Sequence, residues 1–336
     1  MPRPVHNPPN PWLETEIDWE GEPPQTKLEV YEERAISALV ENESPDIGYR
    51  WGINPYRGCY HGCIYCYARP THEYLGWGAG TDFDRRIVVK TNLPALLRKE
   101  MGKPKWAGEL IGFSGVTDCY QPLEASYRIT RGCLEVCRDF ANPVGIITKS
   151  AIIERDLDVL TDLARHAKLG VILSIPFADD DTGRRFEPYA SPISKRLRTL
   201  ARLSAAGIRT GVALAPIIPG VNDASIPDVL LRARDAGARS SFMTLLRLPS
   251  TVRPYFEARV DELVPLRAKK IKNTLHAMRQ GKVNDTFGKR LVGEGPQWNI
   301  VADLFSKQRQ RLGLDEPLME PGPTTFRRPG EQLGLF

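Results

Sequence analysis

The sequence lacks the features that mark membrane and secreted proteins. No apolar run approaches the roughly 18 residues that suggest a membrane-spanning helix. The opening MPRPVHNPPNPW contains no apolar h-region, so a secretory signal is not predicted. Hydrophobic residues make up 41% of the chain and charged residues 26%, as in ordinary globular proteins. We therefore expect a soluble protein without a membrane partner.

A strong excess of one charge is also missing, as is any motif that reads nucleic-acid bases. The formal net charge is +5, and most basic residues, such as Arg196, are scattered over predicted helix faces, where solvation is their usual role. Denser basic groups occur at Lys269-Lys270-Lys272, Lys289-Arg290 and Lys307-Arg309-Arg311. A nucleic-acid partner is compatible with this pattern, but no base-reading motif predicts one.

The 336 residues divide into four zones by composition. Residues 1–46 are rich in proline and acidic side chains and can bury little apolar surface, which predicts an extended lead-in with a short helix near Tyr31–Val40. Strand and helix patterns alternate in residues 47–252, and helical patterns return in residues 253–314. A Pro- and Gly-rich tail that we expect to be flexible spans residues 315–336.

The second zone predicts a parallel sheet. Short apolar segments bounded by Gly, Pro or polar residues alternate with amphipathic helical stretches. Six such units predict right-handed crossovers and an α/β fold, a partial (β/α)6 TIM-like barrel. The run RIVVK, residues 86–90, predicts an additional edge strand. The six predicted strands are Ile47–Asn54, Leu110–Val116, Val144–Thr148, Val171–Pro176, Thr210–Ala215 and Phe242–Leu246.

Three of the six cysteines, Cys59, Cys63 and Cys66, lie within eight residues with the spacing Cys-x3-Cys-x2-Cys. Three thiolates on one short loop suit three irons of a [4Fe-4S] cluster, because sulfur ligands favour iron and the loop brings them together. The fourth iron would then lack a protein ligand, which leaves a position for a chelating molecule.

Other roles for the three cysteines are a zinc site, a disulfide or inert thiols. A structural zinc ion normally has four ligands, and His61 lies between two of the cysteines, where its ring would have to fold onto the same ion. A disulfide suits an odd number of neighbouring thiols poorly. The spacing therefore favours the cluster.

The motif Cys59-x3-Cys63-x-Tyr65-Cys66 resembles the cluster motif of the radical S-adenosylmethionine (SAM) superfamily. The longer run NPYRGCYHGCIYCYARP, residues 54–70, resembles the branch related to spore photoproduct lyase, the DNA repair photolyase-like proteins. The likeness extends over about residues 48–312. It implies a partial barrel, a [4Fe-4S] cluster, bound SAM and an external low-potential electron donor.

This resemblance also implies a reaction. One electron would cleave SAM reductively, and the resulting 5′-deoxyadenosyl radical would abstract hydrogen from a substrate, while the protein binds and orients the reactants. Clustered free thiols and an oxygen-sensitive cofactor favour the reducing cytoplasm.

Polar residues at the next strand ends match the lyase-like pattern. The resemblance implies that Asp118 and Thr117 bind the SAM ammonium, Lys149 its carboxylate and Ser174 its ribose, and that the Tyr65 ring lies near the adenine. Without SAM, Asp118 would cap a helix, Lys149 would be a solvated charge and Ser174 a core hydroxyl.

One departure from that pattern concerns the lyase reaction. Spore photoproduct lyase is expected to carry a hydrogen-donating cysteine two residues before the strand-two aspartate, where this chain has Val116. The neighbouring Cys119 and Tyr120 are the candidates for quenching a product radical instead. Val116 argues against the lyase reaction itself.

Cys133 and Cys137 are four residues apart on the predicted helix Ala125–Phe140 and share one face. That face is otherwise apolar, and cysteine is among the most buried residue types. We predict core residues here and no second cluster.

The rim after the fourth predicted strand carries Arg184, Arg185 and Glu187-Pro188, which are candidates for touching substrate. Similar chains often have a basic residue directly after this Glu-Pro pair, where this chain has Tyr189.

We expect a radical SAM enzyme, with nucleic acid favoured as substrate. The alternatives are action on a protein side chain or small metabolite, and a non-catalytic iron-sulfur module. Nothing in the sequence indicates the oligomeric state.

Overall fold

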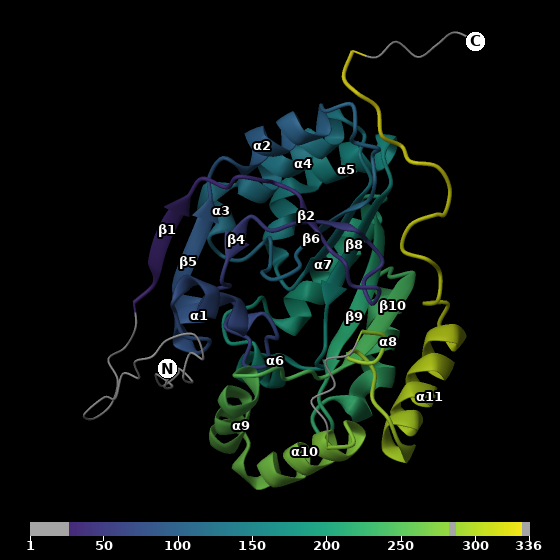
Figure 1. Ribbon diagram of the computed structural model, residues 1–336. Helices are drawn as coiled ribbons and strands as arrows, with labels where there is room; N and C mark the ends of the chain where they lie inside the picture. The colour runs from purple at the N-terminus through teal and green to yellow at the C-terminus, as the bar shows by residue number, and fades with distance from the viewer. Residues whose placement is uncertain (1–26, 282–286, 331–336) are drawn as a thin grey trace.

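The computed structural model describes residues 27–281 and 287–330 and shows an α/β fold built on one large, mostly parallel sheet (Figure 1). Within these residues the sheet order is β10-β9-β8-β7-β6-β3-β2. Only the short β2, at one edge, pairs antiparallel. The strands are β2 (Val40–Glu41), β3 (Trp51–Ile53), β6 (Ile111–Phe113), β7 (Val144–Thr148), β8 (Leu169–Ser174), β9 (Arg209–Ile217) and β10 (Ser240–Leu245).

The predicted partial barrel is confirmed, since each of the six predicted segments overlaps one of the six strands that pair in parallel. These strands can be recognised in the sequence because they are short apolar runs. They are apolar because helices cover them in the fold. In β8, for example, Leu169–Ser174 is buried at every position except Ile172. Strands in parallel sheets are covered on both faces, so they read as continuous hydrophobic segments.

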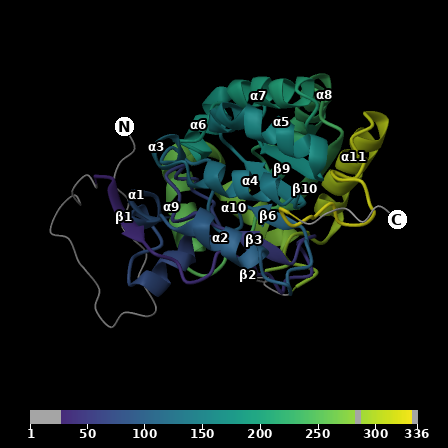
Figure 2. The same cartoon turned by 90° about the horizontal axis from the view of Figure 1, so that it is seen from above.

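Helices form the outer layer. Helices α5, α7 and α8 pack on β8 and β9, α4 packs between α2 and α5, and α11 packs on α8 (Figures 1 and 2). Their bounds are α1 (Thr81–Arg85), α2 (Leu93–Met101), α3 (Glu124–Tyr127), α4 (Ile129–Asp139), α5 (Leu157–His166), α6 (Asp180–Phe186), α7 (Ile193–Ala205), α8 (Ile226–Asp235), α9 (Val252–Leu263), α10 (Pro265–Met278) and α11 (Pro296–Arg311). Short 3-10 turns are η1 (Arg69–Leu75), η2 (Ala151–Asp156) and η3 (Asp223–Ser225).

Two sequence predictions about local structure were wrong. The RIVVK segment, β5 (Arg86–Lys90), is no edge strand of the barrel but the middle strand of a separate sheet, between β1 (Glu29–Glu33) and β4 (Tyr56–Arg57). The helix expected near Tyr31–Val40 is absent, because β1 pairs in parallel with β5. Long-range pairing overrides local propensity at both places.

The predicted helix Ala125–Phe140 is interrupted. Arg128 adopts a left-handed conformation, with φ of 54°, and separates α3 from α4. A left-handed residue cannot continue a right-handed helix, so α4 begins a new axis one residue later.

Glycines are paired in register across four neighbouring strands. Side chains of other segments occupy the space where these glycines have no side chain. A Cβ on Gly112 would lie 2.4 Å from the ring of Tyr49, and one on Gly170 would lie 2.6 Å from Leu318. The described part of the tail, residues 315–330, therefore packs against the sheet. The register partners are Gly52 of β3, Gly112 of β6, Gly145 of β7 and Gly170 of β8.

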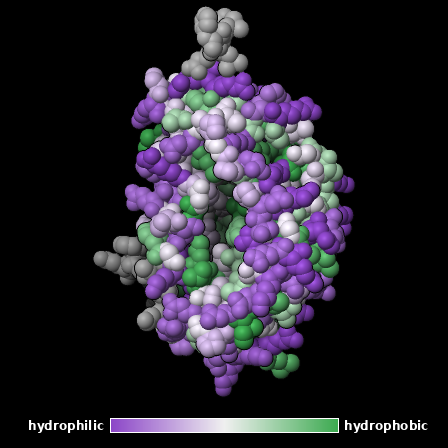
Figure 3. Space-filling view, turned by 90° about the vertical axis from the view of Figure 1, so that its right-hand side faces the viewer, coloured by the Kyte–Doolittle hydropathy of each residue, from purple (hydrophilic) through white to green (hydrophobic). Residues whose placement is uncertain are grey.

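The boundaries of the four zones stay a prediction. Residues 1–26 of the predicted lead-in and 331–336 of the predicted tail lie outside the described residues. No helix in the described ranges is long and apolar enough to cross a membrane. Figure 3 shows a face of the molecule that is hollowed at its centre and covered mostly by hydrophilic side chains.

Candidate active site

The three cysteines lie on one loop that follows β4, near the carboxyl end of β3. None of them forms a disulfide; Cys59 and Cys63 are buried, and Cys66 is half-buried. The loop is fixed by hydrogen bonds to distant segments. The amide of Cys59 donates to the carbonyl oxygen of Phe83 at 3.0 Å, and the amide of Ile64 donates to that of Phe186 at 3.1 Å.

Two glycines shape this loop. Gly58 and Gly62 have φ of 76° and 64°, a region that side chains with a Cβ rarely adopt. Space is also short, because a Cβ on Gly62 would lie 2.9 Å from Oδ2 of Asp84. Any other residue at these positions would be strained, so the conformation of the loop favours glycine.

The three thiols lie near one another within the cysteine loop. In the described residues no three His, Cys, Asp or Glu side chains converge closely enough to hold one ion. The thiols nevertheless interact. Burial chiefly, then Glu187, and then Cys66 and Cys59 raise the pKa of Cys63 well above its ordinary value. A [4Fe-4S] cluster binds each cysteine at a different iron, so it needs neighbouring but separate sulfurs.

A buried polar network lies next to this loop. The hydroxyl of Tyr65 donates to Oε1 of Glu187, and Nζ of Lys149 lies 3.9 Å from the same oxygen. Nη2 of Arg196 lies 2.5 Å from Oε2 of Glu187, and its Nη1 donates to the backbone carbonyl of Ser174 at 2.9 Å. Tyr65 and Lys149, predicted from separate parts of the sequence, thus meet around one carboxylate, whereas the hydroxyl of Ser174 donates to the carbonyl oxygen of Ala215 at 3.4 Å.

Lys149 is the cation of this network that acts on a thiol of the cysteine loop. Its Nζ lies 6.0 Å from the centroid of the Tyr65 ring. Burial opposes protonation of Lys149, but Glu187 and Cys63 outweigh it and raise the pKa of the amine. The lysine is therefore a cation at neutral pH, close to the cysteine loop.

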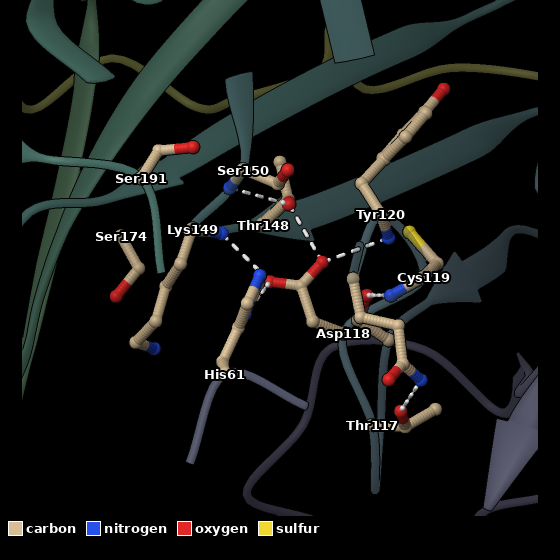
Figure 4. A network of polar contacts seen from close by, with 12 residues as sticks. His61, Thr117, Asp118, Cys119, Tyr120, Thr148, Lys149, Ser150, Ser174 and Ser191 are labelled. Atoms are coloured by element: carbon tan, nitrogen blue, oxygen red, sulfur yellow. Dashed lines mark hydrogen bonds and ion pairs between the residues drawn. The ribbon is translucent and has the colours of Figure 1, made fainter. Parts of the chain in front are cut away.

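Asp118 holds the ends of two strands together (Figure 4). Its Oδ1 accepts from the hydroxyl of Thr148 at 2.7 Å and from the amide of Tyr120 at 2.9 Å. Its Oδ2 accepts from the amide of Lys149 at 2.8 Å and lies 3.4 Å from Nδ1 of His61. A carboxylate has about four acceptor positions, and all four face protein groups here.

The Asp118–His61 pair is charged. Burial opposes ionisation of Asp118, but His61 and the hydrogen bonds outweigh it and lower the pKa of the carboxyl to about 2. Burial likewise opposes protonation of His61, but Cys59 and Asp118 outweigh it and raise the pKa of the ring to about 9. The ion pair connects the cysteine loop to the end of β6.

Thr117 has its own protein partners. Its hydroxyl donates to the carbonyl oxygen of Gly58 at 2.7 Å and accepts from Nε2 of Gln121 at 3.1 Å. The predicted contacts of Thr117 and Asp118 with the SAM ammonium therefore compete with these internal bonds. Val116, in contrast, packs against a small hydrophobic cluster formed by Cys59, Ala68 and Phe83.

Cys119 and Tyr120 do not reach this site. Both are fully buried in the hydrophobic core, and in Figure 4 their side chains point away from Lys149 and Ser174. A substrate radical could reach neither without opening the core, which argues against the predicted quenching role. Cys133 and Cys137 are also fully buried in the core, as predicted.

Comparison with known proteins identifies the family to which this chain belongs. The profile of the radical SAM superfamily matches residues 53–233, more than half of the chain. The chain belongs to the radical SAM superfamily. Membership implies reductive SAM cleavage with an iron-sulfur cluster and an electron donor.

Among the relatives of this radical SAM chain is an uncharacterized protein of Mycobacterium tuberculosis, 35% identical over 210 residues. The match covers 62% of each chain, so this chain spans less than two thirds of that relative. An uncharacterized protein of Methanocaldococcus jannaschii is 31% identical over 201 residues, which cover 59% of this chain and 71% of the relative.

Two further matches carry a name. A Pseudomonas phage protein named radical SAM Nalpha-GlyT isomerase is 24% identical over 169 residues, covering 50% of this chain and 33% of that protein. The solved structure of spore photoproduct lyase complexed with dinucleoside spore photoproduct has a TM-score of 0.60 and 14% identity, over 88% of this chain and 85% of that one. At this identity the structural likeness concerns the fold, and it agrees with the predicted partial barrel.

Sequence reasoning missed the role of Arg196 and misplaced Glu187. Arg196 was expected to be a solvated helix charge, yet its side chain is 1% exposed and pairs with Glu187. Glu187 was expected at the substrate rim, yet its side chain is fully buried. Arg184 and Arg185, in contrast, are exposed as expected. The only sequence signal near the Glu187–Arg196 pair is the Glu187-Pro188 dipeptide after α6. This dipeptide does not indicate that the side chain of Glu187 is buried.

Proposed function

We propose that this chain is a radical SAM enzyme that binds a [4Fe-4S] cluster through Cys59, Cys63 and Cys66 and acts on a substrate by hydrogen abstraction. The observation that carries the proposal is the position of the cysteine loop beside Lys149 and Tyr65. A purely structural cluster would need the three thiols and a fourth ligand, but no half-buried cation beside an aromatic ring.

When bound, the cluster and SAM supply reductive cleavage of the sulfonium and a 5′-deoxyadenosyl radical. The protein supplies binding and orientation. Lys149 offers its ammonium to the SAM carboxylate, because a charged lysine donates strong hydrogen bonds to carboxylates. Ser174 offers a hydroxyl to the ribose, and the Tyr65 ring offers an apolar face to the adenine.

Asp118 and Thr117 act on the same site as positioning residues. Asp118 fixes the backbone amide of Lys149 and the ring of His61, and Thr117 fixes the carbonyl of Gly58. Their proposed effect on SAM is therefore indirect, through the direction of Lys149 and the shape of the cysteine loop. Direct bonding of the SAM ammonium would require one of these internal partners to leave.

Nucleic acid, or a nucleotide-like molecule, is the substrate class that we favour. The likeness to a structure of spore photoproduct lyase holding a dinucleoside supports this preference through the fold. Val116 at the position expected for the hydrogen-donating cysteine argues against the same lyase reaction. A protein side chain or small metabolite is the alternative substrate.

The reducing cytoplasm is the cellular location that we propose, because the thiols must stay reduced to bind iron.

The test is anaerobic reconstitution of the full chain with iron and sulfide, followed by dithionite reduction with SAM. We expect about four irons per chain and formation of 5′-deoxyadenosine. The Cys63→Ala variant should lose the brown chromophore. An intact cluster that forms no 5′-deoxyadenosine would leave the non-catalytic module as the better description, and zinc without iron would refute the cluster.

A further inference from the structure

Arg196 is a fully buried arginine of α7 that lies behind the residues proposed to bind SAM. Its Nη2 lies 2.5 Å from Oε2 of Glu187, the carboxylate that also faces Lys149 and Tyr65. Its Nη1 donates to the backbone carbonyl oxygen of Ser174 at 2.9 Å. One side chain on a helix thus contacts Ser174 directly, and it contacts Lys149 and Tyr65 through a single carboxylate.

Further hydrogen bonds fix the direction of this guanidinium. Its Nε donates to the carbonyl oxygen of Ser191 at 2.6 Å. The hydroxyl of Ser191 accepts from the amide of Ala151 at 2.9 Å, two residues after Lys149. The planar fork of an arginine presents its donors in a rigid arrangement, so acceptors on separate segments hold it in one orientation. Arg196 therefore connects the start of α7 to the ends of β7 and β8.

Two cations share one carboxylate in this network. Among the residues that the structure describes, Glu187 is the only carboxylate within ion-pair distance of Arg196 or Lys149. Asp118, which also acts on Lys149, is paired with His61 instead. A charge in a poorly solvated site is costly unless it is paired. The network therefore has one positive charge in excess, which a second carboxylate would balance.

The two cations are not held equally. Arg196 is buried and lies 2.5 Å from the carboxylate of Glu187, whereas Nζ of Lys149 lies 3.9 Å from it and the side chain of this lysine is 20% exposed. Electrostatic attraction falls with distance, so Arg196 is the principal counterion of Glu187. In Figure 4 the side chains of Lys149 and Ser174 point in the same direction. Lys149 is thus the cation that can turn to another carboxylate.

We propose that Arg196 is a positioning residue of the SAM site, which neutralises Glu187 and so leaves the ammonium of Lys149 available to the SAM carboxylate. The inference rests on the proposed function, in which Lys149 binds that carboxylate. Arg196 acts only through its neighbours and contacts neither SAM nor the cluster. Without it, Glu187 would keep Lys149 as its counterion, and two carboxylates would compete for one ammonium.

The experiment is a double-mutant cycle on SAM binding, measured by equilibrium dialysis of labelled SAM against the reconstituted full chain. Arg196→Gln removes the cation and keeps an amide donor. Glu187→Gln removes the competing carboxylate, and the double variant Glu187→Gln/Arg196→Gln removes both charges. Arg198→Gln, at an exposed position of the same helix, is the matched control.

We expect the dissociation constant of SAM to rise roughly tenfold or more in Arg196→Gln, the size expected for a hydrogen bond to a charged group. The double variant should return to within about threefold of the unaltered enzyme, because Lys149 again has no competing carboxylate. Glu187→Gln should bind SAM at least as tightly as the unaltered enzyme, and Arg198→Gln normally. A loss that reflects only damaged packing would not be reversed by a second substitution in the same buried pair.

A second measurement uses the cluster-free chain and needs no SAM. Acetic anhydride labels amines, and mass spectrometry gives the labelling rate at Lys149, with the exposed Lys195 as internal standard. A close carboxylate holds a lysine in its unreactive charged form. Labelling of Lys149 should therefore be slower in Arg196→Gln than in the unaltered chain, and should recover in the double variant.

Three results would overturn the inference: unchanged SAM binding in Arg196→Gln, a double variant that binds SAM as weakly as the single one, or unchanged labelling of Lys149 in Arg196→Gln. If Arg196→Gln does not fold, the double variant still decides, since a tenfold loss of SAM binding there would show that more than the charge of Glu187 is at stake. Failure of the unaltered, cluster-loaded enzyme to bind SAM would instead contradict the proposed function.

Discussion

Arg69 donates from Nε and Nη2 to the backbone carbonyl oxygen of Cys63, at 3.1 and 3.0 Å. The same guanidinium donates from Nη1 to the carbonyl of Gly80 at 2.6 Å and lies 4.2 Å from the ring centroid of Tyr255 in α9. Its Nη2 is 3.9 Å from Asp84, and the side chain is fully buried. One buried cation thus ties the cysteine loop to α1 with its N-cap and to α9.

Arg69→Gln should destabilise the protein before any cofactor is considered. The substitution removes the cation that acts most strongly on the buried Asp84, leaving only Arg85 and Arg259. Breaking a buried ion pair costs up to about 3–5 kcal/mol. Urea unfolding of the cluster-free protein measures the free energy of unfolding. Adding Asp84→Asn to the variant should recover part of the loss. A change below about 1 kcal/mol, the scale of an exposed pair, would show that Arg69 does not support the loop.

Gly62→Ala should lower the amount of cluster that the chain binds, because the new Cβ would lie 2.9 Å from Asp84 in a backbone with φ of 64°. Gly76→Ala is the matched control, since Gly76 has φ of 74° but no atom within 4 Å of a built Cβ. Both variants pay about 1–2 kcal/mol for the left-handed backbone. Iron content after reconstitution should therefore fall clearly more for Gly62→Ala. Equal iron content in the two variants would mean that crowding at Gly62 is unimportant.

Lys149→Gln should weaken SAM binding roughly 10- to 100-fold, because a hydrogen bond to a charged group contributes about 1.5–3 kcal/mol. Equilibrium dialysis of labelled SAM against the reconstituted enzyme measures the dissociation constant. Lys195→Gln, at an exposed position of α7, serves as the control and should bind SAM normally. Unchanged binding in Lys149→Gln would remove the lysine from the proposed site.

Acid should destabilise the folded chain partly through His72. Burial lowers the pKa of this ring from 6.5 to about 4, and its Nε2 lies 2.8 Å from the carbonyl oxygen of Arg86. Between these two pH values the unfolded chain holds a proton that the folded chain does not, so the free energy of unfolding falls as pH falls. Across this whole pH range the free energy of unfolding falls by about 3 kcal/mol because of His72.

The measurement is urea unfolding between pH 7 and pH 4. His72→Gln should have a shallower loss of stability across this window than the unaltered chain, whatever its stability at pH 7. His166→Gln, which changes a histidine with a 58% exposed side chain, should keep the original slope. The same slope in all three proteins would contradict a buried, neutral His72.

The barrel could be predicted because its information is local. A strand such as Val144–Thr148 is a short apolar run with a polar end, and the cysteine spacing is visible in eight residues. The sheet of β1, β5 and β4 could not be predicted, because Glu29 pairs with Arg86, 57 residues away, and neither segment reveals its partner. Local pattern thus identified the main sheet and failed for the pairing between distant segments.

The candidate site shows the same division. Lys149 follows one predicted strand and Ser174 lies within the next, so both could be predicted to lie near the edge of the barrel where the carboxyl ends of parallel strands meet. The internal partners of Asp118 were not predictable, since they depend on how the ends of β6 and β7 approach His61. The Glu187–Arg196 pair escaped for a similar reason, because both residue types are usually exposed.

The row of glycines also bears on the order in which the newly made chain assembles. The strands that carry it begin at Trp51, whereas Leu318, which fills the space over Gly170, follows every strand and helix of the described residues. Synthesis runs from the amino terminus, and early segments fold before late ones exist. The cysteine loop is therefore made before the sheet behind it can acquire its final packing, because the segment that fills the space over Gly170 comes later in the chain.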